Sequence, residues 1–185
     1  MLKNVRVVLV LLVMCGIAYP LLLTGFSQVL MPAKADGSVI KNAEGKIIGS
    51  ELIGQSFQKA KYFHGRVSSI NYDSASSGTP NYAPSNKDMI DRTKKDIAKF
   101  LKENPRVKKE DIPADLLTNS GSGLDPNISP QGAKIQVPRI AKERGMDESK
   151  IYGLVETYTE GRSLGLFGDP KVNVLKLNIA LDKLD

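Results

Sequence analysis

The sequence is poor in the side chains that carry most catalytic and metal-binding chemistry. Its 185 residues include one cysteine, one histidine and no tryptophan. The lone Cys15 excludes an intramolecular disulfide, and with His64 as the only histidine no zinc site of the usual four-ligand type can form. Any nucleophile activated by a histidine base would have to use His64.

Charge of either sign is also modest. There are 26 basic and 20 acidic residues, and because Lys3 and Arg6 belong to the N-terminal segment, the remainder carries 24 cations and 20 anions, a net charge of +4. The cations do not cluster or alternate with aromatic residues as they do in nucleic-acid-binding proteins. The composition indicates an ordinary charged surface and argues against a nucleic-acid partner.

One long apolar segment stands out against this composition. From Val5 to Met31 nearly every residue is apolar, and nothing comparable follows. A hydrocarbon core about 30 Å thick requires roughly 20 apolar helical residues. We therefore predict a single transmembrane anchor over residues 5–31, with a kink at Pro20, which lacks a backbone donor.

Two other interpretations of this segment are weaker. A cleaved signal peptide would end at residues 33–35, but the apolar core of a signal peptide is about 7 to 15 residues, shorter than this segment. A lipoprotein signal would place a small residue before Cys15, where the sequence has the bulky Met14. Cys15 is more simply an apolar residue of the anchor.

The charges that flank the anchor predict its orientation. Lys3 and Arg6 precede the span and no acidic residue occurs before Asp36, whereas Lys34 is a single cation on the far side. Cationic flanks remain in the cytoplasm, so we expect a cytoplasmic N-terminus and one extracytoplasmic domain over residues 36–185. The element pattern makes this an α+β (mixed α/β) domain tethered by one N-terminal transmembrane helix.

Residues that cap or end helices predict where the helices of this domain lie. Ser85 or Asn86 can cap a helix that Asn104-Pro105 ends, Ser129-Pro130 can start another, and Asp147 can cap a third. The last segment fits both a strand and a helix, and helix is slightly favoured because Asp169-Pro170 would start one well. The predicted elements are a hairpin with strands at residues 39–40 and 47–48, a helix over 87–103, a strand over 112–117, a helix from 130 toward Gly145 split by Pro138, a helix after Asp147 and a helix within 172–184.

Two long loops separate these elements. The first long loop, Asn71–Asn86, contains Tyr72 and Tyr82 and is either docked on something or mobile. The second long loop, Thr118–Pro130, is dense in glycine and serine. Backbone amides before a helix attract phosphate, but this loop lacks the lysine of a P-loop and contains Asp125, so a structural turn is favoured over a phosphate site.

Catalytic interpretations find little support. His64 has no nucleophile beside it, and the sequence gives no reason to bring Asp73, Asp125 or Glu160 together for acid–base work. An independent hydrolase is therefore disfavoured. The residues alone indicate a membrane-tethered subunit that binds other proteins.

Several motifs of this domain are distinctive when taken together: Tyr62–Ser68, Ser77–Asn81, Pro84–Asn86, Pro113–Pro130, Gln136–Arg139, Thr159–Arg162 and Gly168–Leu175. The most specific is the Ser-Gly-Ser-Gly-Leu-Asp-Pro string of the second long loop. These motifs resemble the KdpC family, the C subunit of the bacterial Kdp potassium-transporting P-type ATPase. Val67 and Asn127 depart from the proline and histidine usual in the family, and Thr79-Pro80 departs from its glycine-serine loop.

This resemblance implies an accessory subunit of a high-affinity ATP-driven potassium uptake complex in the bacterial plasma membrane. The subunit is not an enzyme on its own, and no metal site is expected. Potassium is the transported ion. The implied partners are a channel-like potassium-binding subunit, a P-type ATPase subunit and a small single-span subunit. The loops expected to face them contain His64, Arg66, Tyr72, Tyr82, Asp125 and Pro126.

The family is also described as a catalytic chaperone that raises the ATP affinity of the pump subunit. By resemblance, nucleotide contact would fall on Ser76, Ser77, Gly78, Ser120, Gly121, Ser122 and Gly123. ATP is hydrolysed in the cytoplasm, whereas the predicted orientation puts these loops outside, so an indirect effect through the assembled complex is favoured. Direct nucleotide binding and an outer-face filter for potassium are the alternatives.

Overall fold

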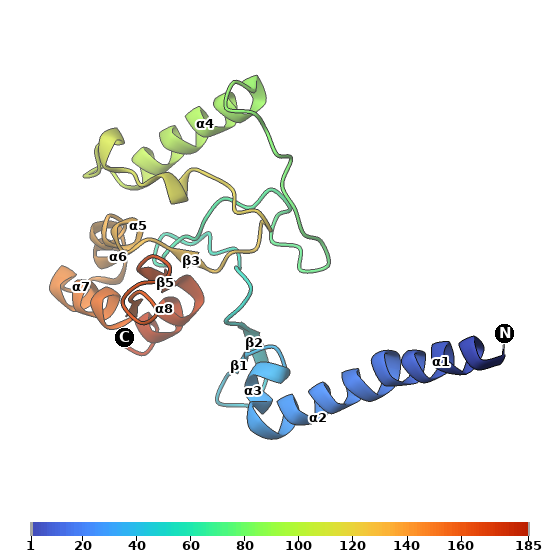
Figure 1. Cartoon of the computed structure of the whole chain (residues 1–185). Helices are drawn as coiled ribbons and strands as arrows, with labels where there is room; N and C mark the ends of the chain where they lie inside the picture. The colour runs from blue at the N-terminus through green and yellow to red at the C-terminus, as the bar shows by residue number, and fades with distance from the viewer. Residues whose placement is uncertain (1, 185) are drawn as a thin grey trace. The chain divides into compact units, whose positions relative to one another are not determined.

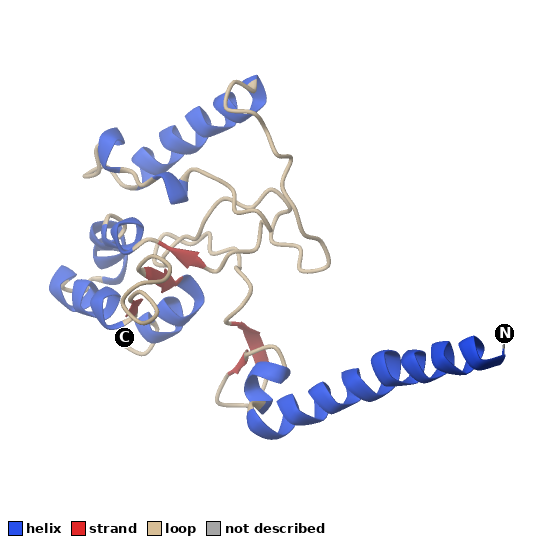
Figure 2. Cartoon of the chain, in the orientation of Figure 1, coloured by secondary structure: helices blue, strands red, loops and turns tan. Residues whose placement is uncertain are grey.

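The computed structural model describes residues 2–184, which divide into two compact units, with the boundary along the chain between Ser50 and Glu51. The first unit is a long helix followed by a hairpin, and the second contains the remaining helices and a small sheet (Figure 1). More residues lie in helices than in strands, and long stretches of the chain are loop (Figure 2). The predicted mixture of helix and sheet with one apolar N-terminal helix is confirmed.

The apolar helix of the first unit runs from Leu2 to Leu30 as α1 (Leu2–Val13), η1 (Met14–Ala18) and α2 (Tyr19–Leu30). The most apolar 18-residue stretch of this helix has a mean hydropathy of 2.6, and none of its residues is buried. Within residues 2–184 it is the one helix long and apolar enough to cross a membrane. The helix accounts for all but Met31 of the predicted anchor.

A π-helical turn precedes Pro20, the residue at which a kink is predicted. Met14–Ala18 form a π-helical turn, in which the Tyr19 amide donates to the carbonyl of Met14. A wider turn accommodates a proline ring and its missing donor without ending the helix. Thr24 Oγ1 also donates to the Pro20 carbonyl at 2.9 Å.

The hairpin follows a short helix, α3 (Pro32–Ala35). Strands β1 (Val39–Lys41) and β2 (Ile47–Ser50) pair antiparallel, as predicted. Asn42 Oδ1 accepts from the amides of Glu44 and Lys46 at 3.1 and 2.9 Å, and Gly45 has φ +79°. An asparagine turn with glycine at a positive φ thus closes the hairpin.

The helices of the second unit begin where their caps predict. Asn86 accepts from the Met89 amide ahead of α4 (Lys87–Glu103), Ser129 from Gly132 ahead of α5 (Pro130–Lys134), and Asp147 from Ser149 ahead of α7 (Glu148–Thr157). Helix α6 (Val137–Arg144) ends at Gly145, which has φ +64°. The predicted split lies at residues 135–136, so Pro138 falls in the first turn of α6, where proline is tolerated.

A small antiparallel sheet has the order β3 (Asn127–Ile128), β5 (Lys171–Asn173), β4 (Thr159–Glu160). The C-terminal segment contains both structures that its pattern allowed, because β5 passes directly into α8 (Val174–Leu181). Asn173, whose side chain accepts from the Lys176 amide, starts that helix rather than Asp169-Pro170.

The strand predicted over residues 112–117 is wrong. This stretch follows one 3₁₀ turn, η2 (Lys109–Asp111), and contains another, η3 (Ala114–Leu116). Ile112 and Leu116 are both buried. Their spacing in the sequence places both side chains on the inner side of the two tight turns, and this resembles the alternation of a strand. Pro113 between them has no amide to contribute to a ladder.

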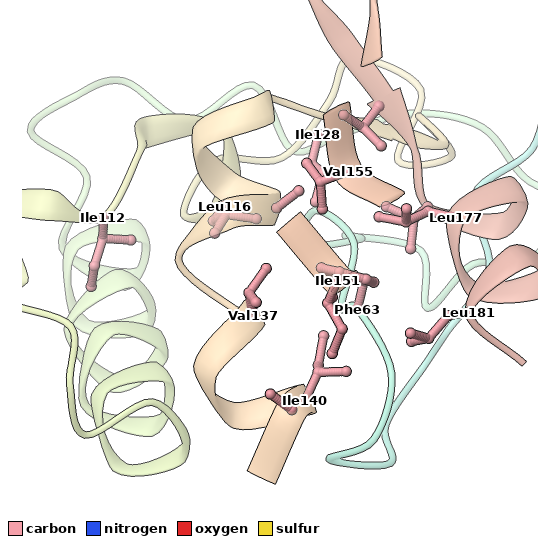
Figure 3. Packing of buried hydrophobic residues seen from close by; sticks show 14 residues of the cluster. Phe63, Ile112, Leu116, Ile128, Val137, Ile140, Ile151, Val155, Leu177 and Leu181 are labelled. Carbon is pink, nitrogen blue, oxygen red and sulfur yellow. The ribbon is translucent and has the colours of Figure 1, made fainter. Parts of the chain in front are cut away.

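The core of the second unit lies among α5, α6, α7 and α8. Figure 3 shows Phe63, which comes from a loop, among helical residues that include Ile140, Ile151 and Leu181. All four side chains are fully buried. Burying one such side chain stabilises the fold by roughly 1.5–3 kcal/mol. The core therefore fixes the segment on either side of Phe63.

Buried amides take the place of strand partners for this segment. Asn178 Oδ1 accepts from the Phe63 amide at 2.9 Å, and Asn178 Nδ2 donates to the Phe63 carbonyl at 3.0 Å. In the same way, Gln136 Oε1 accepts from the His64 amide at 2.8 Å, and Gln136 Nε2 donates to the His64 carbonyl at 3.1 Å. From Glu51 to Asn86, all of it described, the chain has turns but no helix or strand. Side-chain amides thus satisfy backbone groups that a sheet would otherwise pair.

Candidate functional site

The two long loops meet in the second unit. The Gly78 amide of the first long loop donates to the Ser122 carbonyl of the second at 2.9 Å. Asn119 Nδ2 and Thr79 Oγ1 lie 3.4 Å apart, and Ser69 Oγ donates to the Gly78 carbonyl at 2.8 Å. Gly78 and Ser122 both belong to the sets that the resemblance assigned to nucleotide contact. The structure therefore brings those two sets together.

The second long loop uses its own amides internally. Ser120 Oγ accepts from the Gly123 and Asp125 amides at 2.9 and 3.4 Å, and Ser122 Oγ accepts from the Leu124 amide at 3.1 Å. A phosphate-binding loop instead points its amides outward at the anion. These contacts agree with the structural turn that the sequence favoured.

Two glycines let other segments approach this loop closely. A Cβ at Gly54 would lie 2.8 Å from the Asp125 carbonyl oxygen, and one at Gly123 would lie 2.9 Å from Ile70 Cγ1. Gly123 also has φ +73°, a conformation that favours glycine. The second long loop is therefore packed from several sides.

Arg66 joins the segment after Phe63 to the second long loop. Its guanidinium lies 3.0 Å from Asp125 Oδ2 and 3.3 Å from the Asn119 carbonyl. The Tyr72 hydroxyl donates to the Arg66 carbonyl through a short hydrogen bond, and burial raises the pKa of Tyr72. Asp125 Oδ1 accepts from the Asn127 amide at 2.9 Å. Three of the residues predicted to face partners are thus held in one ion-paired cluster.

An open hollow of about 580 Å³ lies beside this cluster. Its lining includes Leu52, Arg66, Asn119 and Gly121. Arg66 Nε and Asn119 Oδ1 are buried there without a hydrogen-bond partner in the part of the chain that the structure describes. One donor and one acceptor of this cluster are therefore unsatisfied within the described residues.

His64 lies outside this hollow and against α4. Its Nε2 is 3.2 Å from the Lys59 carbonyl oxygen, and its Nδ1 is 3.6 Å from Glu103 Oε2. Burial, with the nearby charge of Arg139, lowers the pKa of His64, although Lys59 and Glu103 oppose this shift. His64 is neutral at pH 7 and joins a loop to a helix.

Residues 1–183 match the family model described as KdpC: K+-transporting ATPase, c chain. The chain belongs to the KdpC family. It is 52% identical over 180 residues to the potassium-transporting ATPase KdpC subunit of Bacillus cereus strain B4264, covering 97% of this chain and 93% of that one. The KdpC subunits of a second Bacillus cereus strain and of Bacillus anthracis are each 51% identical over the same shares.

Two of the departures from the usual KdpC pattern, Asn127 and Val67, lie in different surroundings. Asn127, where histidine is usual, donates from Nδ2 to Asp125 Oδ1 at 3.1 Å and so supports the Arg66 cluster. Val67 follows Arg66 and is half-buried at the edge of a shallow depression that His64 also lines. The asparagine therefore has a structural partner in this KdpC chain.

The remaining predicted residues of this KdpC chain are spread more widely. Tyr82 is 41% exposed, and Ser77 and Gly121 are exposed too. Ser76 is turned toward its own loop, where its Oγ donates to Asp73 Oδ2 at 3.0 Å. The Pro126 carbonyl accepts from the Val174 amide at 2.9 Å. Ser77 and Gly121 therefore remain open to solvent, whereas Pro126 is tied to α8.

We expect the stability of this KdpC chain to fall in mild acid because of His64. A lowered pKa means that the folded chain binds the proton less tightly than the unfolded chain, whose histidine titrates near 6.5. The contribution of neutral His64 to the free energy of unfolding is complete above about pH 6.5. It is lost as the pH falls toward the lower pKa that His64 has in the folded chain. Unfolding free energies measured between pH 7.5 and 5 should therefore decline less steeply for His64→Gln. Parallel pH profiles for the two proteins would contradict this.

Sequence reasoning missed two features of this KdpC chain. Buried Arg139 contacts Asn104, Gln136 and two loop carbonyls, and its position in an amphipathic helix gave no sign of this. The turn at residues 163–167 exposes three large apolar side chains. The signal was available for the second feature, since an apolar run between Gly161 and Gly168 is unusual for a loop.

Proposed function

We propose that this chain is a single-span, non-catalytic accessory subunit of a high-affinity, ATP-driven potassium uptake complex, needed for the complex to assemble and remain stable. The observation that carries the proposal is the joining of an unburied apolar helix, Leu2–Leu30, to a separate folded unit in a chain of the KdpC family. An apolar helix with none of its surface covered requires lipid or other helices around it.

The partners we propose are the channel-like potassium-binding subunit, the P-type ATPase subunit and the small single-span subunit. The cations Lys3 and Arg6 support a cytoplasmic N-terminus and a second unit on the outer side of the plasma membrane. A role as catalytic chaperone then acts through the assembled complex, because the unit and the ATP site lie on opposite sides. Such coupling requires only that both sites bias one shared equilibrium.

Assembly is tested by exchanging the anchor. A chain whose residues 2–30 are replaced by an unrelated apolar span of equal length keeps its membrane tether but loses the specific helix surface. We expect the other subunits to stop co-purifying with it, and growth at limiting potassium to fail in cells that lack their own C subunit. Undiminished co-purification would contradict a role for the anchor in assembly.

Orientation is tested with reporter cysteines in a Cys15→Ser background. Ser77 and Ser122 are both exposed, so Ser77→Cys and Ser122→Cys should react with a membrane-impermeant reagent added to intact cells. Labelling only after the membrane is opened would place the second unit in the cytoplasm.

Direct nucleotide binding is the second candidate, and the meeting of Gly78 with Ser122 favours it. Its weakness is that several loop amides are engaged internally. Full-length chain in detergent, titrated with a fluorescent ATP analogue, tests it. Saturable binding that Ser122→Ala weakens and unlabelled ATP competes away would favour this candidate, and its absence would leave the indirect route.

A further inference from the structure

The connection between β4 and β5 ends in a tight hairpin with an apolar tip. Ser163 and Phe167 pair through both backbone hydrogen bonds, at 2.9 and 3.0 Å. We call residues 163–167 the apolar tip. Its three large side chains are mostly in solvent: Leu164 is 89% exposed, Leu166 73% and Phe167 65%.

Leu164 is unfavourable in the isolated chain for two reasons. It has φ +54°, in the left-handed region that aliphatic residues seldom adopt, and it leads into Gly165 at φ +73°. Its side chain also stays in water. Neither cost is offset by a contact within the described part of the chain, and residues strained in this way cluster at functional positions.

The tip is organised in advance for insertion into an apolar environment. The amides of Gly165 and Leu166 donate to the carbonyls of Arg162 and Ser163, so the turn satisfies its own backbone. Below it, Arg162 lies 2.9 Å from Asp169, and Lys171 lies 3.8 Å from Glu160. Lys176 also lies 3.9 Å from Glu160 and 2.7 Å from Glu51. Three cations are thus matched by three anions at the base.

We propose that the apolar tip inserts into an apolar pocket on another subunit of the potassium-transporting ATPase, an inference that rests on the proposed function. A compact cluster of one aromatic and two aliphatic side chains on a rigid turn has the form of an interface anchor. The neutral, ion-paired base argues against a lipid surface, because loops that bind anionic headgroups add unpaired cations. A mainly apolar exposed cluster of this kind marks an interaction site.

The test compares two variants of the full chain. Leu164→Asn/Phe167→Thr removes the apolar surface and keeps the turn, because asparagine tolerates a positive φ. Leu184→Asn is the control, since Leu184 is an exposed leucine of the same unit beyond α8. We expect the double variant to bind the remaining subunits in detergent at least about 30-fold more weakly, with an unchanged unfolding midpoint.

Equal affinity of the double variant and the control would overturn the proposal, and an unmodified chain that fails to bind would instead refute the proposed function. The lipid alternative is measured separately. Because the chain lacks tryptophan, Phe167→Trp gives a single fluorophore, and Tyr82→Trp provides the comparison. Quenching of Phe167→Trp alone by brominated lipid, in discs that hold only this chain, would assign the tip to the membrane and overturn the proposal.

Discussion

Arg139→Met should destabilise the second unit by about 3 to 5 kcal/mol, because it removes four hydrogen bonds that Arg139 donates to acceptors at a buried position. The guanidinium donates to Asn104 Oδ1 at 3.0 Å, to Gln136 Oε1 at 2.8 Å and to the Tyr62 carbonyl at 3.0 Å. It also donates to the Ala60 carbonyl. Arg139 is 7% exposed, so water cannot readily replace these bonds.

The matched control is Arg106→Met. Arg106 pairs with Glu148, but its side chain is 67% exposed, and exposed pairs contribute at most about 1 kcal/mol. Denaturant unfolding of the full chain, followed by circular dichroism, should separate the two variants clearly. Similar losses for both would mean that the Arg139 network does not hold the loop.

Gly123→Ala is expected to cost about 2 to 5 kcal/mol and to loosen the contact between the two long loops. The left-handed conformation contributes about 1 to 2 kcal/mol, and crowding adds a further 1 to 3 kcal/mol. The crowding arises because a Cβ would lie 2.9 Å from Ile70 Cγ1 and 3.2 Å from the Gly78 carbonyl oxygen.

Gly121→Ala, two residues away, should change stability by less than about 0.5 kcal/mol. No atom lies within 4 Å of a Cβ built there, and its φ is not positive. Limited proteolysis of the first long loop reports the loss of the contact. Faster cleavage in Gly123→Ala but not in Gly121→Ala is the expected pattern, and equal cleavage rates would contradict it.

Local chemistry predicted the helices well and the sheet poorly. Helix α4 begins after the cap at Asn86 and ends before Pro105, because both signals act within one turn. The strands β3 and β4 have two residues each, too short for an alternating pattern to show. Apolar spacing also misled at Ile112, where two 3₁₀ turns gave the appearance of a strand.

The sequence predicted which loops form the site, but not the contacts between them. The turn chemistry of the second long loop is visible in its serines, which accept from amides two to five residues away. The contacts of Arg66 with Asp125 and of Gly78 with Ser122 join residues far apart in sequence. No periodicity or spacing encodes such pairs, because tertiary packing alone brings them together.

The order in which the chain is synthesised gives the buried amide of Asn178 a further consequence. The segment around Phe63 emerges from the ribosome early, yet its backbone partner is Asn178, 115 residues later. The Glu51 carbonyl likewise accepts from Asn173 Nδ2 at 2.8 Å, across 122 residues. Contacts this distant in sequence close late and slow folding. The second unit therefore completes its fold only after nearly the whole chain has been made, and a chain that stops before Asn178 keeps the Phe63 backbone unpaired.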